Sequence, residues 1–204
     1  MKKQVKAGDA MREIKNLKAH LAQKRPDGWE ELPDLALYMD QLISYMPRQL
    51  LATEEGDALT AAMVNNYIKA GLLPRADGKR YGRKHLAYLT AICALKPVLS
   101  MRELAELLSA VDHQHVIAED WYGFFLGKLN ESMTTVADSL DEEAGEADLP
   151  ALAFRLALDS YANKLACQRV LDVMREKAQK STALPAGEKK KKKKEEKGRK
   201  EGKT

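Results

Sequence analysis

Amide and basic side chains between positions 65 and 84 have the chemistry to bind a nucleic acid. Asn65 and Asn66 are adjacent, and an asparagine amide can form two hydrogen bonds with adenine in the major groove of DNA. Basic side chains follow at Lys69, Arg75, Lys79, Arg80, Arg83 and Lys84, and all of these except Lys84 are predicted to contact phosphates. Residues 69–84 therefore carry a net charge of +5, with Asp77 as the single acid. This pattern predicts a double-stranded DNA partner, and the alternative is an ordinary solvated loop.

A short helix is expected to present the two asparagines. Thr60 is a good N-cap, and Gly71 suits the position just after a helix end. Val64 and Tyr67 recur on one face, which leaves Asn65, Asn66 and Lys69 on the other. We expect the asparagines to meet base edges, and the alternative is that they are simple surface residues.

A tight turn and a second helix are predicted after this helix. Asp77-Gly78 is a strong signal for a two-residue β-hairpin turn, and a helix is predicted from Arg83 to Leu95. Helix, basic hairpin and helix together give the layout of a winged helix-turn-helix. In this arrangement Arg80 could enter the minor groove, and Tyr81 could either bond a phosphate or pack beneath the wing.

Two strings of residues in this segment resemble known bacterial regulators. NNYIKAGLLP and GKRYGRKHLAYL look like the winged helix of MerR-type proteins. More closely, residues 32–108 are similar to a YkrK-like bacterial family that is known mainly as a domain of unknown function. The resemblance implies a MerR-like DNA-binding head and a transcription regulator. The sequence departs from the MerR-type pattern at two places. Asn65 and Asn66 stand where many MerR-type helices carry Arg and Tyr. Residues 53–59 make the connection within the helix pair longer than is usual in a helix-turn-helix.

The rest of the chain divides by composition into further segments. The predicted organisation is a basic helical arm at 1–30, a winged helix-turn-helix domain at 31–111, a helical hairpin at 112–180 and a disordered Lys/Glu-rich tail at 181–204. The fold class is thus all-α with a small β-hairpin wing, a MerR-like head followed by a long helical hairpin. The hairpin could form a homodimer or pack on its own head domain. Residues 26–187 sum to a charge of −8, so the +5 cluster lies within an otherwise acidic region.

Other functional classes find little support in the sequence. No apolar run of eighteen residues exists, so no membrane partner is expected, and the two cysteines lack metal spacing, which favours a cytoplasmic location. His115 and Glu119 have a spacing that could hold a metal, but no second cluster completes a site. The aromatic residues at 121–125 could pack in the core or line an effector pocket, and no effector is identifiable. We find no catalytic motif, so neither enzymatic activity nor a cofactor is expected.

Together these observations predict a sequence-specific, double-stranded DNA-binding transcription regulator of the MerR-like type that acts as a homodimer. The alternative is a non-enzymatic interaction module or scaffold that uses the same head without binding DNA.

Overall fold

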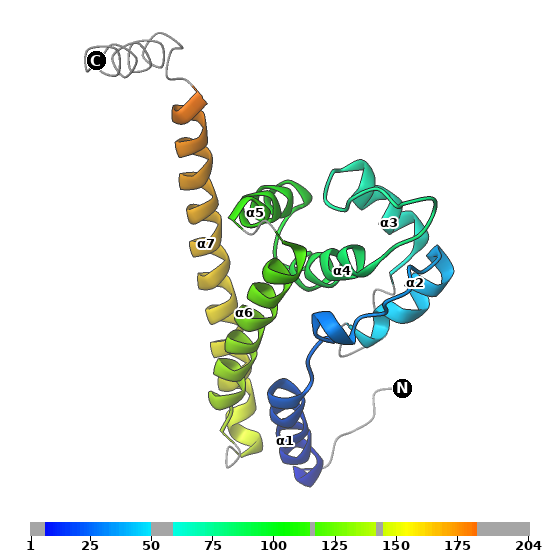
Figure 1. The fold of residues 1–204 in the computed structure, drawn as a ribbon. Helices are drawn as coiled ribbons and strands as arrows, with labels where there is room; N and C mark the ends of the chain where they lie inside the picture. Colours follow the sequence, from blue (N-terminus) through cyan, green and yellow to red (C-terminus); the bar gives the residue numbers. More distant parts are fainter. Residues whose placement is uncertain (1–6, 50–58, 115–116, 142–144, 183–204) are drawn as a thin grey trace, which may run out of the picture. The chain divides into compact units, whose positions relative to one another are not determined.

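The computed structural model describes residues 7–49, 59–114, 117–141 and 145–182, and this part of the chain is helical. Its α-helices, labelled in Figure 1, are α1 (Ala7–Gln23), α2 (Met39–Tyr45), α3 (Ala61–Lys69), α4 (Arg83–Leu95), α5 (Met101–Gln114), α6 (Ala118–Asp138) and α7 (Leu149–Thr182). Short 3-10 turns lie at η1 (Trp29–Glu31), η2 (Met46–Arg48) and η3 (Glu146–Asp148). The chain divides into two compact units, Met1–Asp159 and Ser160–Thr204. Among the described helices, none combines the length and the apolar character needed to cross a bilayer.

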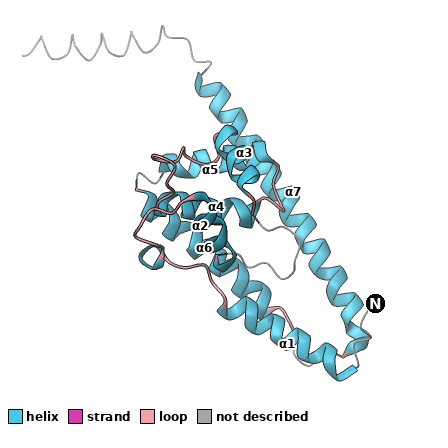
Figure 2. Ribbon diagram, turned by 90° about the vertical axis from the view of Figure 1, so that its right-hand side faces the viewer, coloured by secondary structure: helices cyan, strands magenta, loops and turns pink. Residues whose placement is uncertain are grey.

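The predicted β-hairpin wing is wrong, because the described residues contain no β-strand (Figure 2). What remains of it is a tight turn in which Asp77 and Arg80 exchange both backbone hydrogen bonds, at 3.1 and 2.9 Å. Gly78 and Lys79 have φ values of 53° and 70°, the combination of positive angles that a type I′ turn requires. The Asp77-Gly78 signal therefore gave the turn correctly, but the flanking residues do not pair as strands.

The imidazole of His85 explains why the hairpin stops after one rung. In an antiparallel ladder of this register, Arg75 and Gly82 would form the next hydrogen-bonded pair. Instead, the Gly82 N–H donates to His85 Nδ1 at 3.1 Å, and the Arg75 carbonyl lies 3.1 Å from His85 Nε2. The backbone of Tyr81 pairs with Leu37, at 2.8 and 2.9 Å, which fastens the turn to the segment before α2.

The core of the first unit lies around α4. Leu86, Leu89 and Ile92 on this helix are fully buried, and Trp121 and Tyr122 of α6 are buried as well. Tyr88 of α4 stacks on Trp121, with ring centroids 4.7 Å apart. Of the aromatic residues at 121–125, Trp121 and Tyr122 are therefore core residues, as one of the two sequence interpretations expected, whereas Phe124 is 44% exposed.

Helix α1 packs along α6. Arg25, just after α1, donates from Nε to Asn130 Oδ1 at 2.6 Å, and Lys18 Nζ donates to the Leu140 carbonyl at 3.3 Å. The N-terminal basic segment is therefore attached to α6 over its described part. The helices predicted within 112–180 correspond to α6 and α7.

A cluster of hydrogen-bonded polar side chains joins distant parts of the first unit. Gln49 is 1% exposed, and its Nε2 donates to Asp27 Oδ2 at 2.6 Å and to the Tyr45 hydroxyl at 2.9 Å. Its Oε1 accepts from the Asp27 backbone N–H at 3.0 Å. The Tyr122 hydroxyl donates to the Asp27 carbonyl at 2.8 Å, and so joins residues 95 positions apart. Burial, followed by the hydrogen bond to the Asp27 carboxylate, raises the pKa of Tyr45 well above its ordinary value.

Some sequence predictions concern residues that the structure does not describe. These are the connection at 53–58, His115 of the possible metal pair, and the tail from residue 183 onward.

Candidate nucleic-acid interface

Helix α3 begins and ends at the residues that the sequence predicted. Thr60 Oγ1 accepts a hydrogen bond from the Met63 N–H at 3.2 Å, which confirms the N-cap. At the other end Gly71 has a φ of 73°, its N–H donates to the Ile68 carbonyl at 3.1 Å, and the Leu72 N–H donates to the Tyr67 carbonyl at 2.9 Å. These two bonds form a complete Schellman motif, which satisfies carbonyls that the helix end would leave unpaired.

The polar face of α3 is exposed, as expected. Val64 and Tyr67 are buried, whereas Asn65, Asn66 and Lys69 are all exposed. Within the described part of the chain, these three side chains form no hydrogen bond or ion pair. Their amide and ammonium groups therefore face solvent and can bond to an external partner.

Two further cations lie beside the end of α3. Arg75 and Lys84 line a hollow of about 410 Å³ together with residues of α3, α4 and α5. The hollow has an apolar lining formed by Ile68, Gly71, Leu72, Leu73, Pro74, Tyr88, Ala105 and Leu108, and Ser109 adds a hydroxyl. Lys84 Nζ lies 5.7 Å from the Tyr88 ring centroid, a cation–π distance. The fold thus brings the cations of positions 75 and 84 together at one helix end.

Lys79 and Arg80 lie on the tight turn, and both are exposed. Arg80 Nη2 donates to the Tyr38 hydroxyl at 3.1 Å, and its guanidinium carbon lies 5.1 Å from the centroid of the same ring. Because tyrosine is neutral, these contacts orient the guanidinium without cancelling its charge.

Tyr81 faces inward. It is 5% exposed, and its ring meets the His85 ring edge to face at 5.4 Å. Burial raises the pKa of its phenol. Of the two roles considered for Tyr81, the structure places it in the packing role.

Arg83 is directed toward the N-terminal segment rather than toward open solvent. Its Nε donates to the Leu32 carbonyl at 3.2 Å, and its terminal nitrogens lie 3.5 Å from Glu30 and 3.3 Å from Asp34. Only 24% of the side chain is exposed. Two carboxylates compensate this charge, so Arg83 serves to hold residues 30–34 against the start of α4.

Sequence reasoning missed His85, although this residue fixes the loop that carries most of the cations. Its Nδ1 accepts from Gly82 and its Nε2 therefore carries the proton that is donated to the Arg75 carbonyl. The spacing Gly82-x-x-His85 is that of a capping box, with histidine in the place usually taken by glutamate. The Gly82-x-x-His85 spacing is therefore the feature of the sequence that could have indicated this role of His85.

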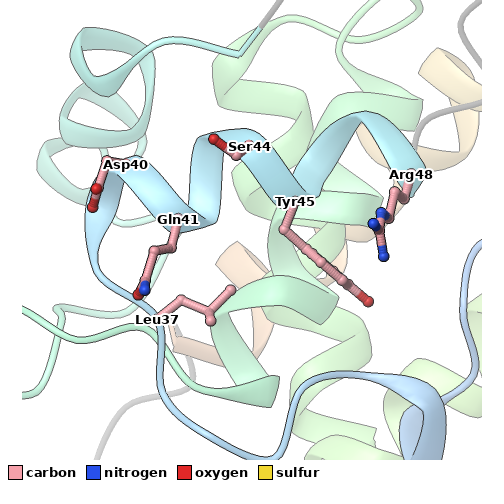
Figure 3. A pocket seen from close by; sticks show the side chains of 6 residues that line it. All are labelled: Leu37, Asp40, Gln41, Ser44, Tyr45 and Arg48. Atoms are coloured by element: carbon pink, nitrogen blue, oxygen red, sulfur yellow. The ribbon is translucent and has the colours of Figure 1, made fainter.

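A second hollow, of about 390 Å³, runs along α2 (Figure 3). It is lined by Leu37, Asp40, Gln41, Ser44, Tyr45 and Arg48. All except Leu37 belong to the single run α2–η2, and the lining carries charges of both signs. Across the described residues, no cluster of three potential metal ligands was found here or elsewhere.

One protein-family model matches the part of the chain that contains these features. Residues 27–125 match the family model for a domain of unknown function, DUF1836. The match begins at Asp27 and includes Tyr122, the two residues joined by the hydrogen bond that closes the first unit. All the residues of the candidate interface fall inside the match. No curated protein and no solved structure matches the chain.

Proposed function

We propose that the DUF1836 segment binds double-stranded DNA and that the protein is a transcription regulator. Helix α3 enters the major groove, where Asn65 and Asn66 meet base edges. The cations around α3 bind phosphates and set the position of the helix; they are Lys69, Arg75, Lys79, Arg80 and Lys84. This binding mode needs no wing, and the resemblance to MerR-type and YkrK-like proteins enters the proposal through the helical elements alone.

The uncompensated charge around α3 carries the proposal. Within the described residues none of these five cations has an acidic partner, whereas Arg83 has two. An exposed cation that pairs with no carboxylate remains available to a polyanion, and several on one short segment attract it together. In this proposal Arg83 supports the interface by holding residues 30–34 against the start of α4, and it does not contact a phosphate.

The proposal gives a measurable salt dependence. Each neutralised phosphate contributes about −0.9 to the slope of log affinity against log salt concentration. Five contacts therefore give a slope of about −4.5. A slope near zero would overturn the proposal, because a complex without phosphate contacts releases few counterions.

The direct experiment is selection of bound genomic DNA fragments by the purified full chain, followed by anisotropy titrations on the enriched duplex. The variant Lys79→Glu with Arg80→Glu should lose at least 100-fold in affinity, since two attractions become repulsions. The matched control is Lys15→Glu with Lys128→Glu, which makes the same change in net charge at exposed positions on α1 and α6. We expect this control to change affinity by less than about threefold, because neither lysine belongs to the candidate interface and Lys128 is already paired with Glu131 at 2.8 Å.

A second pair of variants separates base recognition from phosphate binding. Asn65→Ala with Asn66→Ala should reduce the preference for the enriched duplex over random DNA by about 1–3 kcal/mol per lost bidentate contact, with little change in the salt slope. If no duplex is enriched, or if the Lys79/Arg80 variant binds as tightly as the control, the alternative of a protein-interaction scaffold is favoured instead.

A further inference from the structure

Helix α7 exposes a row of large apolar side chains. The helix is continuous from Leu149 to Thr182, and four of its residues are among the most exposed hydrophobic side chains described. The exposed fractions are 67% for Phe154, 51% for Leu158, 63% for Tyr161 and 48% for Leu165. A contiguous apolar row of this kind marks an interaction surface, since single exposed apolar residues scatter and do not align.

The spacing of the row is that of a coiled-coil seam. The steps from Phe154 to Leu165 are four, three and four residues, so the side chains share one face of the helix. The next seam positions would be Gln168 and Asp172, which are polar and end the row. Val170 is also exposed, at 59%, but its position is turned by about 150° from the seam at 100° per residue.

The seam is complementary to itself. Its four positions are symmetric about the midpoint between Asp159 and Ser160. When two such helices lie antiparallel across a two-fold axis, Phe154 meets Leu165 of the second copy, and Leu158 meets Tyr161 of the second copy. Each large aromatic ring therefore faces a leucine. The same residue pairs occur on both sides of the axis, as the isologous interface of a two-fold symmetric dimer requires.

The area of the seam fits a weak dimer. From the exposed fractions, the four side chains offer about 400 Å² in each copy, if a fully exposed side chain presents roughly 150–250 Å². Two copies would bury about 800–900 Å², which is at the low end for specific interfaces and typical of transient association. Arg155 beside the seam is already compensated, because it lies 3.6 Å from Asp159 and donates to the Ser139 carbonyl at 3.0 Å.

We propose that a second copy of this chain packs on the Phe154–Leu165 seam as an antiparallel helix pair. The inference does not depend on DNA binding, because the seam lies on a different helix from the candidate interface and its test contains no DNA.

The test is the mass of the full chain in solution, measured by sedimentation equilibrium from about 1 to 200 µM. The wild type should shift from monomer to dimer over this range, and Leu158→Glu with Tyr161→Glu should remain a monomer throughout. The control Val170→Glu with Asn163→Glu introduces the same two negative charges at exposed positions on the opposite face of the same helix and should dimerise like the wild type. Circular dichroism checks that all three proteins keep the same helix content, as expected for exposed positions.

Three outcomes would overturn the proposal. A wild type that stays monomeric to 200 µM would indicate that the seam is covered by the chain's own residues. A Leu158/Tyr161 variant that still dimerises would place the interface elsewhere. Equal loss of dimer in the Val170/Asn163 control would show that charge on α7, rather than the seam, controls association. DNA affinity, measured separately at submicromolar protein, distinguishes failure of this inference from failure of the proposed function.

Discussion

Replacing Gln49 by leucine should destabilise the first unit strongly although the side chain keeps almost the same volume. The buried amide makes four contacts, to the Asp27 carboxylate, the Asp27 N–H, the Tyr45 hydroxyl and, at 3.5 Å, the Tyr122 hydroxyl. Leucine makes none of them. Asp27 Oδ2 would keep its bond from Tyr45, and Tyr122 would keep the Asp27 carbonyl, but the Asp27 N–H would have no acceptor.

The magnitude follows from these losses. An unpaired buried N–H costs about 1–3 kcal/mol, and the lost hydrogen bond to a carboxylate adds about 1.5–3 kcal/mol. Burial of the additional apolar surface of leucine offsets about 1 kcal/mol of this cost. We therefore expect Gln49→Leu to lower the free energy of unfolding by about 3 kcal/mol, which corresponds to a decrease of roughly 6–12 °C in Tm for a protein of this size.

Urea unfolding followed by tryptophan fluorescence is the appropriate assay. Trp29 and Trp121 lie beside Tyr122, with ring centroids 6.3 and 6.5 Å from it, so both tryptophans report on this region. Gln23→Leu, at an exposed position at the end of α1, is the matched control and should change stability by less than about 0.5 kcal/mol. If Gln49→Leu unfolds within 1 kcal/mol of the wild type, the view that this amide holds the segment closed is refuted.

Three further predictions follow from local features. Gly71→Ala should lower the free energy of unfolding by about 1–2 kcal/mol in thermal or urea unfolding. An alanine Cβ would meet no atom there, so the cost is that of the backbone angle φ of 73° alone. An unchanged free energy of unfolding would contradict the Schellman geometry. Burial raises the pKa of Tyr122 from 10.0 to about 12, so the folded chain keeps a proton that the unfolded chain releases. The stability that this phenol contributes should be full below pH 10 and should be lost as the pH rises toward 12. This loss of stability should be smaller in Tyr122→Phe. Partial burial of Cys93 also raises its pKa to about 11. In a Cys167→Ser variant its alkylation at pH 8 should therefore be about 100-fold slower than that of a free thiol, and a rate near that of the free thiol would contradict the raised pKa.

Features set by neighbouring residues were predictable from the sequence. The N-cap at Thr60, the stop at Gly71 and the turn at Asp77-Gly78 depend on contacts within three to five positions, and all three are present. The exposed face of α3 follows from the same local periodicity. Each of these features is encoded where it occurs.

Features that depend on distant partners were not predictable in this way. The wing failed because a side chain three residues beyond Gly82 takes the backbone groups that a strand pair would use, and hairpin signals do not include such competition. Arg83 looked like a free cation because its partners, Glu30 and Asp34, lie about fifty positions earlier. Charge counted along the chain therefore overestimates the charge available at the surface.

Lysine at position 79 has a consequence for how this protein should be engineered. Its φ of 70° belongs to the left-handed region, where glycine has no steric penalty and a lysine side chain costs about 1–2 kcal/mol. A screen that selects variants only for heat resistance would favour glycine at this position and would remove a positive charge from the turn in the same step. Thermostabilised versions of the chain should therefore keep residue 79 fixed, so that a gain in melting temperature is not obtained by discarding a cation.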